Sequence, residues 1–501
     1  MDKQIRRLGY ALLALFVLLL ATVSYVQVVA AARIADNPAN AFRQLVAEYR
    51  VQRGRILARD LTTVLAFSKK GAGELKYGRH YPDGRRYSGI TGYYSLLFGR
   101  GELEQSQNQF LSGNAAELLP QTLVDKILSR PVQGATVVTT IDPAIQKAAC
   151  RAIASLPHGG AVVAIEPATG DVLAMCSNPA YDPSDISSQD VPQIRRAWRR
   201  LNADPGQPLV PRADAQLFPP GSTFKLVTAA AALENGYGPD SLWPNPASLT
   251  LPLTSHRLHN FGGEICSGGS HITLADALRQ SCNVVFGGIG LKLGPDRMAE
   301  EARKFGFAAD TASGDVPFDV PFREGVFPTP SAFVGQPASV AFSAIGQFDV
   351  SANPMQMALV ASAIANDGVL LAPRLVTQIR DSQGQIVKTF EPAEYSRPLT
   401  AEHAHQLRDM MVAVVQSGTG YAAQIPGVTV AGKTGTAQHG GANEPPHAWF
   451  TAFAPAENPQ VAVAVIVLDG GDLGSDATGG RVAAPIAKQV IEAALGISGG
   501  A

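Results

Sequence analysis

The longest apolar run of the chain lies near its N-terminus, where residues 8–32 include no charged side chain. As a helix, this run is about 37 Å long, which is enough to cross a hydrocarbon core of about 30 Å. Lys3, Arg6 and Arg7 precede the run, and basic residues beside a span stay on the cytoplasmic side. We therefore predict a cytoplasmic tail over residues 1–7, a single membrane anchor over residues 8–32, and an extracytoplasmic position for everything that follows.

A cleaved signal peptide is the alternative, because residues 28–32 offer small side chains to a peptidase. The apolar run is longer than the core of a signal peptide, so the pattern favours a retained anchor. Tyr10, Tyr25 and Gln27 fit the interfacial ends of such an anchor.

Residues 33–156 carry the short apolar segments that are typical of strands. Two strands separated by a turn are predicted within residues 51–66, and residues 81–94 are rich in Tyr, Gly and Pro. We also predict a helix over 118–129, a strand over 134–141, and a second helix that Asp142-Pro143 caps and that runs to about residue 155. No catalytic cluster is evident here, so we predict a β-rich platform that holds a catalytic domain away from the bilayer.

The larger remainder, residues 157–495, predicts one α+β domain, an antiparallel sheet flanked by helices, with a short tail over 496–501. Its strands are expected over residues 160–165, 171–176, 369–379, 428–437, 448–454 and 461–468. Its helices are expected after Ser222 to residue 233 and over 274–280, 283–307, 335–346, 354–366, 403–416 and 485–495. The turn at residues 166–170 includes Glu166, which we interpret as a turn residue, and residues 177–217 are polar and Pro-rich, as in a loop.

Composition agrees with a globular protein of two or three domains, because 46% of the 501 residues are hydrophobic and 17% are charged. The net charge of -1 gives no reason to expect nucleic acid as a partner. The nine histidines are scattered, and His439 and His447 lack matching Cys, Asp or Glu spacing, so no metal or other cofactor is expected. These two histidines are interpreted as structural or as residues of a cleft rim.

Four cysteines in an oxidising compartment can pair in three ways. We hypothesise that Cys266 pairs with Cys282, since a short segment separates them. Cys150 then pairs with Cys176, which links a predicted helix to a predicted strand.

The most distinctive segment surrounds Ser222-Thr223-Phe224-Lys225. Pro219, Pro220 and Gly221 disfavour a helix before Ser222, and the apolar, Ala-rich residues after Lys225 favour one behind it. Ser222 is thus predicted at a helix N-terminus, with Lys225 on the same face of the first turn. A desolvated lysine can remove the proton of a serine, provided that its pKa falls from about 10.4 to near 7 through burial or a second cation.

Lys433-Thr434-Gly435 forms a second candidate, on a predicted strand. Gly435 leaves room for another backbone, so a substrate strand could add to this edge. Lys433 would then hold a substrate carboxylate, together with Thr434 or Thr436.

Ser-x-Asn occurs four times, and Ser281-Cys282-Asn283 is chosen because it follows a short helix and lies between the other two motifs in the chain. Ser281 could relay a proton between Lys225 and a leaving amine. Asn283 could bind a substrate amide. By contrast, Ser351-Ala352-Asn353 is interpreted as a helix cap.

In this order and spacing the three motifs resemble those of penicillin-binding proteins and serine β-lactamases. Arg53-Gly54-Arg55-Ile56 is similar to the opening of the class B N-terminal domain, and residues 134–146 resemble that class's lead into its transpeptidase domain. Gly418-Thr419-Gly420 and residues 447–450 are similar to positions that flank the third motif. Over nearly the whole length, the chain looks most like the penicillin-binding protein A branch of class B. One departure is that residues 56–65 lack the usual Asp-Arg-Asn-Gly.

The resemblance implies a D,D-transpeptidase that cross-links the stem peptides of lipid-linked or nascent peptidoglycan and that β-lactams acylate. It implies that Ser222 attacks the D-Ala-D-Ala carbonyl, that Lys225 is the base, and that Ser281 and Lys433 pass protons. The backbone N–H groups of Ser222 and Thr436 would hold the oxyanion. The platform would be of the class B dimerisation type, and glycan strands would come from a separate membrane glycosyltransferase.

Four other functions remain open at this point. A β-lactamase needs a base for water, and no glutamate with supporting context is evident. A D,D-carboxypeptidase uses the same acyl-enzyme, and only the platform favours transpeptidation over it. A β-lactam sensor needs more than about seven cytoplasmic residues, and a non-enzymatic scaffold would not need Ser222.

Overall fold

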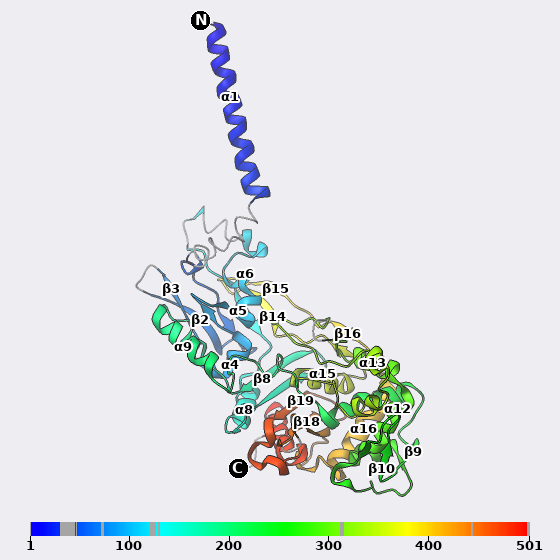
Figure 1. The fold of residues 1–501 in the computed structure, drawn as a ribbon. Helices are drawn as coiled ribbons and strands as arrows, with labels where there is room; N and C mark the ends of the chain where they lie inside the picture. The colour runs from blue at the N-terminus through cyan, green and yellow to red at the C-terminus, as the bar shows by residue number, and fades with distance from the viewer. Residues whose placement is uncertain are drawn as a thin grey trace.

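The computed structural model describes residues 2–30, 46, 48–71, 75–120, 127–128, 131–310, 315–441 and 444–497. Its N-terminal helix α1, Asp2–Ser24, continues into a π-helical turn over Tyr25–Val29 (Figure 1). The apolar helix Lys3–Gln27 is long and apolar enough to cross a membrane, and none of its most apolar window is buried. The predicted helix over 118–129 falls mainly on residues outside the described ranges.

A smaller, β-rich body follows and is built on a six-stranded sheet in the order β15-β14-β6-β1-β2-β3. Four of its strands come from the predicted platform: β1 Ile56–Leu57, β2 Val64–Lys70, β3 Tyr77–His80 and β6 Thr136–Thr139. Short helices accompany them: α4 Gly84–Thr91, α5 Glu102–Ser106 and α6 Asn108–Leu111. The two-strand pattern predicted within residues 51–66 is confirmed by the antiparallel pairing of β1 with β2.

The other two strands of this sheet come from much later in the chain. β14, Val376–Arg380, pairs with β6, and β15, Ile386–Thr389, pairs with β14 (Figure 1). The strand predicted over 369–379 is therefore wrong as one element, because β13, Leu370–Leu371, pairs instead with β16, Glu394–Ser396. A hairpin from the second predicted domain thus completes the sheet of the first.

The larger body is built on a five-stranded sheet in the order β17-β18-β19-β7-β8, and all neighbouring strands are antiparallel. Its strands are β7 Gly160–Glu166, β8 Asp171–Asn178, β17 Ala431–Ala437, β18 His447–Ala454 and β19 Val461–Val467. Each residue of β18 and β19 is buried, because both faces of the sheet are covered. The α+β fold class is confirmed.

Two separate apolar cores flank this sheet, and successive strand residues alternate between them. Val162 and Ala164 of β7 face a core that includes α8, Pro143–Ile153, and α17, Ala484–Ala494. Val163 and Ile165 face the other core, which includes α10, Lys225–Glu234, and α15, Pro354–Ala365.

The helices between the strands lie close to their predicted positions: α10 Lys225–Glu234, α11 Leu274–Gln280, α12 Asn283–Leu293, α13 Pro295–Lys304, α14 Ala338–Ser343 and α16 Ala401–Ser417. Asn353 caps α15 by accepting a hydrogen bond from the Gln356 N–H, as predicted for the Ser-x-Asn there. Asp142 likewise caps α8. The structure joins Cys150 of α8 to Cys176 of β8 by a disulfide.

Two elements differ from the prediction. The helix α8, which we assigned to the platform, packs on β7, β8 and α17 of the larger body. The segment predicted as a loop before Ser222 contains α9, Val191–Ala203. Helix α9 packs against the platform, because its Ile194 is buried in a cluster with Tyr49 and Tyr94 of the platform (Figure 1).

A buried ion cluster holds the platform together. Glu104 accepts hydrogen bonds from Arg53 Nε and Arg79 Nε, both at 2.6 Å, and all three side chains are almost fully buried. Burial alone would raise the pKa of Glu104, but the two guanidinium groups outweigh it and hold the pKa below its usual value. Breaking such a cluster leaves uncompensated buried charge, which is far more costly than losing an exposed ion pair.

We expect Glu104→Gln to lower the free energy of unfolding by about 3–5 kcal/mol at neutral pH, measured by chemical denaturation. Because the folded-state pKa of Glu104 is lowered, its stabilisation is present above the unfolded-state pKa. It disappears as pH falls through the folded-state pKa, so the two proteins converge in acid. As a control, Glu117→Gln removes an exposed pair with Lys388 and should cost less than about 1 kcal/mol. Equal losses in both variants would contradict this assignment.

Candidate active site

Ser222 lies at the start of a buried helix, as predicted. The first turn, Gly221–Phe224, is a 3-10 helix, and α10 continues from Lys225 to Glu234. Gly221 has a φ of 53°, and a Cβ there would lie 2.9 Å from the carbonyl oxygen of Thr436. The turn therefore requires glycine, and it leaves Ser222 half-buried at the wall of a cleft of about 1140 Å³.

Lys225 is fully buried and binds the second motif. Its Nζ donates to the carbonyl oxygen of Ser281 and to Asn283 Oδ1, both at 2.7 Å, and lies 3.3 Å from Ser281 Oγ. Ser281 occupies the left-handed region, with a φ of 60°, at the end of α11, which turns its carbonyl toward the lysine. Among the described residues, no hydrogen bond joins Lys225 to Ser222.

Lys433 approaches the same hydroxyl from β17. Its Nζ donates to Ser281 Oγ at 2.8 Å and to the carbonyl oxygen of Thr434 at 3.0 Å. Burial, and secondarily the charge of Lys433, lower the pKa of Lys225 well below its usual value. Burial lowers the pKa of Lys433 to about 7. The structure thus brings Lys225, Ser281 and Lys433 of three separate motifs into one network.

The other predicted binding residues lie on the same cleft. Asn283, Thr434 and Thr436 line it together with Ser222 and Ser281. Asn283 also donates through Nδ2 to the carbonyl oxygen of His259 at 3.1 Å, so its amide is held from both ends. β17 is the terminal strand of the five-stranded sheet, so its outer edge is available to an extended peptide.

Gly435 makes a close approach that differs from the expected one. A Cβ there would lie 3.0 Å from the carbonyl oxygen of Pro220, from Thr223 Cγ2 and from Trp449 Cβ. Its neighbour on this side is therefore the protein's own Ser222 segment. Gly435 allows β17 to pack directly against the turn that carries the serine.

Several supporting residues were not singled out from the sequence. Trp449 Nε1 donates to the carbonyl oxygen of Pro219 at 2.9 Å, and the carbonyl oxygen of Gly346 accepts from the Gly221 N–H at 2.9 Å. Thr419 Oγ1 lies 2.6 Å from Thr434 Oγ1. No local pattern indicates these contacts, because each partner comes from a distant part of the chain; only the resemblance drew attention to the segments of Thr419 and Trp449.

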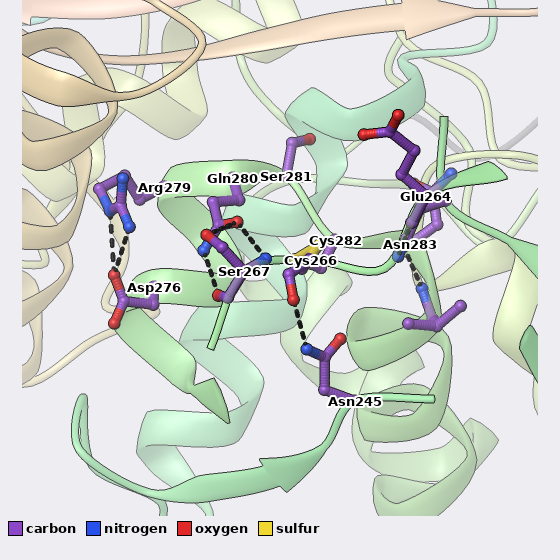
Figure 2. Close-up of a disulfide and its surroundings, with 12 residues drawn as sticks. Asn245, Glu264, Cys266, Ser267, Asp276, Arg279, Gln280, Ser281, Cys282 and Asn283 are labelled. Carbon is purple, nitrogen blue, oxygen red and sulfur yellow. Dashed lines mark hydrogen bonds and ion pairs between the residues drawn. A yellow bond between two sulfur atoms is a disulfide. The ribbon is translucent and has the colours of Figure 1, made fainter. Parts of the chain in front are cut away.

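Cys282, the middle residue of the second motif, forms a disulfide. The structure joins Cys282 to Cys266, and Figure 2 shows this bond between Ser281 and Asn283 on one side and the loop of Cys266 on the other. Asn245 Nδ2 donates to the carbonyl oxygen of Cys266 at 2.7 Å, and Gln280 pairs with Ser267 (Figure 2). The cleft-lining loop is thereby attached on both sides of Cys266.

Comparison with known proteins gives consistent results. Residues 160–492 match the family described as the penicillin binding protein transpeptidase domain, and residues 53–137 match the penicillin binding protein A dimerisation domain. The chain is 40% identical to peptidoglycan D,D-transpeptidase PbpA of Mycolicibacterium smegmatis over 99% of both chains. It is 38% identical to PbpA of Mycobacterium tuberculosis, again over 99% of both chains.

Solved structures agree with these sequence relatives. The ceftriaxone acyl-enzyme complex of penicillin-binding protein A from M. tuberculosis is similar, with a TM-score of 0.84 and 37% identity, over 90% of this chain and 100% of that chain. The penicillin G acyl-enzyme complex of the same protein has a TM-score of 0.82 and 37% identity, over 89% and 100% of the chains.

With Ser222 as nucleophile, Lys225 as base and Lys433 as carboxylate ligand, the roles expected from the sequence, the two buried lysines predict a bell-shaped pH dependence for the second-order rate of acylation by penicillin. Toward acid the rate falls as Lys225 gains a proton and can no longer act as a base. Above about pH 7 the rate falls as Lys433 loses the charge that would hold the penicillin carboxylate. Stopped-flow kinetics across the range measure both limbs.

Lys433→Gln sharpens this test. Removing the neighbouring positive charge raises the pKa of Lys225, so the acid limb should move to higher pH while the alkaline limb disappears. Lys488→Gln, which removes a surface lysine beside Glu492, should leave the profile unchanged. An unmoved acid limb in Lys433→Gln would show that the two lysines are not coupled.

Proposed function

The chain belongs to the penicillin-binding proteins, and we propose that Ser222 is the nucleophile of its transpeptidase domain. Its activity is that of a serine-type peptidoglycan D,D-transpeptidase in cell-wall synthesis, and β-lactams acylate it. The observation that carries the assignment of Ser222 is the buried network of Lys225, Ser281 and Lys433 beside it. From its position in this network we assign a role to each side chain.

Lys225 is arranged to act as a base in its neutral form. A neutral amine has two N–H donors and one lone pair, and the two 2.7 Å acceptors on Ser281 and Asn283 use both donors. The lone pair is left for the proton of Ser222. Burial, with the charge of Lys433, lowers the pKa of Lys225 and so favours this neutral form.

In the first step, Ser222 Oγ attacks the carbonyl carbon of the penultimate D-alanine while Lys225 takes its proton. The backbone N–H groups of Ser222 and Thr436 hold the oxyanion. The C–N bond then breaks, and the departing D-alanine amine receives a proton from Lys225 through the Ser281 hydroxyl. Lys433 donates to that hydroxyl at 2.8 Å and so keeps it oriented.

In the second step, the amine of another stem peptide attacks the acyl-enzyme, passes a proton back through the same network, and releases Ser222. Before the first step, Lys433, Thr434 and Thr436 bind the carboxylate of the donor's terminal D-alanine on β17. Thr419, at 2.6 Å from the Thr434 hydroxyl, fixes the direction of that hydroxyl.

Water instead of an amine would make the chain a D,D-carboxypeptidase or, with a β-lactam, a β-lactamase. The match of residues 53–137 to a penicillin-binding protein A dimerisation domain supports transpeptidation, because hydrolysis needs no platform of this kind. The choice of acceptor is therefore the property that an experiment must separate.

Intact-protein mass spectrometry of the full chain with penicillin G should show one penicilloyl adduct that decays slowly. Ser222→Ala should show none, because this variant lacks the hydroxyl that is proposed to form the ester. Ser331→Ala, a change on an exposed turn, is the control and should acylate normally. An adduct on Ser222→Ala would overturn the assignment, and rapid release of penicilloic acid by the unchanged chain would identify a β-lactamase.

We further propose that α1 anchors the chain in the bacterial cell membrane, with residues 1–7 in the cytoplasm and the catalytic domain outside. Lys3, Arg6 and Arg7 at its start support this orientation.

The two family matches describe no glycosyltransferase, so a separate membrane glycosyltransferase would supply the glycan strands. A penicillin that cannot cross membranes should label intact spheroplasts, and a photo-cross-linking residue at Leu19 should capture the glycosyltransferase. Labelling only after lysis would contradict the proposed orientation. Capture of lipid alone would contradict the proposed glycosyltransferase partner.

A further inference from the structure

Two histidines and an aspartate meet at the end of the five-stranded sheet, outside the catalytic network. Ala437 of β17 pairs with His447 of β18, and Val467 of β19 pairs with Ala448. His439 and Asp469 each follow their strand by two residues, so strand register brings them to the same edge as His447. Local spacing could not indicate this, because the carboxylate comes from a third strand.

We propose that His439, His447 and Asp469 form a binding site for a zinc-like divalent cation. Among the described residues they are the one group of three such side chains whose ligand atoms all lie within 4.8 Å of one another. His439 Nε2 is 2.9 Å and His447 Nδ1 is 3.4 Å from Asp469 Oδ1. Two imidazoles and a carboxylate are a ligand set that zinc accepts, with one position left open.

One of the two nitrogen–oxygen distances already fits a tetrahedral ion, and the other, 2.9 Å from His439 Nε2 to Asp469 Oδ1, must lengthen. Two ligands at about 2.1 Å from one zinc ion lie about 3.4 Å apart. The His447–Asp469 separation of 3.4 Å already has this value. The two rings stack with centroids 3.7 Å apart, so the ring of His439 must tilt away from that of His447 on binding.

A second carboxylate supports His439 in the orientation that a metal ligand needs. Glu444 Oε2 lies 3.4 Å from His439 Nδ1, while Nε2 faces Asp469. A histidine that binds metal through one nitrogen commonly donates its other N–H to a carboxylate, which fixes the tautomer. His439 Nε2 lies 2.9 Å from the carbonyl oxygen of Pro445, and His447 Nδ1 accepts a hydrogen bond from the Asp469 N–H at 3.2 Å. A bound metal would replace these two contacts.

The site would connect two segments at the mouth of the cleft. Gln438, Glu444 and Pro446 line the cleft from the β17–β18 connection, and Ser475 and Thr478 line it from the segment after β19. Bound zinc would hold these segments together and would therefore change the rate at which a β-lactam reaches Ser222.

The test is a zinc titration of the full chain in detergent, in competition with a chromophoric chelator, followed by Co²⁺ substitution. We expect one zinc ion per chain and a visible Co²⁺ spectrum of tetrahedral type. His439→Ala and Asp469→Asn should each weaken binding by about tenfold or more, and Glu444→Gln by about tenfold. These three side chains are not fully buried, so the variants should fold.

His405→Ala is the matched control, because His405 pairs with Asp367 at 2.8 Å and lacks a third ligand. It should bind zinc as the unchanged chain does. Substoichiometric zinc in the unchanged chain, or equal affinity in His439→Ala and Asp469→Asn, would overturn the site and leave an ordinary hydrogen-bonded cluster. If zinc binds but penicillin acylation is unchanged by it, the connection between the two segments is wrong.

Discussion

Two lysine side chains buried around one serine hydroxyl are the constraint on which the active site depends. Taking each charge out of water costs several kcal/mol, and two like charges at this distance repel. The protein offsets part of this cost with carbonyl and amide acceptors on Ser281, Asn283 and Thr434. The remainder lowers the pKa of both lysines, as the proposed role of Lys225 as a base requires.

Such a network functions only if its three segments cannot move apart. α10 is buried along nearly its full length, and β17 lies directly against the Ser222 turn because Gly435 and Gly221 have no side chains. Trp449 adds a hydrogen bond to Pro219, and the Cys266–Cys282 disulfide attaches the second motif to its neighbouring loop (Figure 2). Backbone packing, more than side-chain contact, sets the distances between the motifs.

The platform and the catalytic body are interlocked rather than joined by a linker. The β14–β15 hairpin completes the platform sheet, and α8, which follows the platform strand β6 in the chain, packs on the catalytic sheet (Figure 1). The Cys150–Cys176 disulfide then fixes α8 to β8.

The sequence by itself determined the elements and the chemistry of the motifs. Pro219-Pro220-Gly221 followed by an Ala-rich run predicts the turn and helix at Ser222, and the apolar run over residues 461–468 predicts a strand. Local preference and periodicity suffice there, because neighbouring residues decide the outcome. Only the tertiary structure decided that β6 and β14, which are about 240 residues apart in the chain, would pair in one sheet. It also decided which segment would pack against Gly435, and that Asp469 would lie beside His439 and His447. Helix α9 was missed although its local signals are present, because Asp190 caps it and Ile194, Ala197 and Leu201 recur at helical spacing. What only folding decides there is the surface on which it packs, since the partners of Ile194 are Tyr49 and Tyr94 from a distant part of the chain.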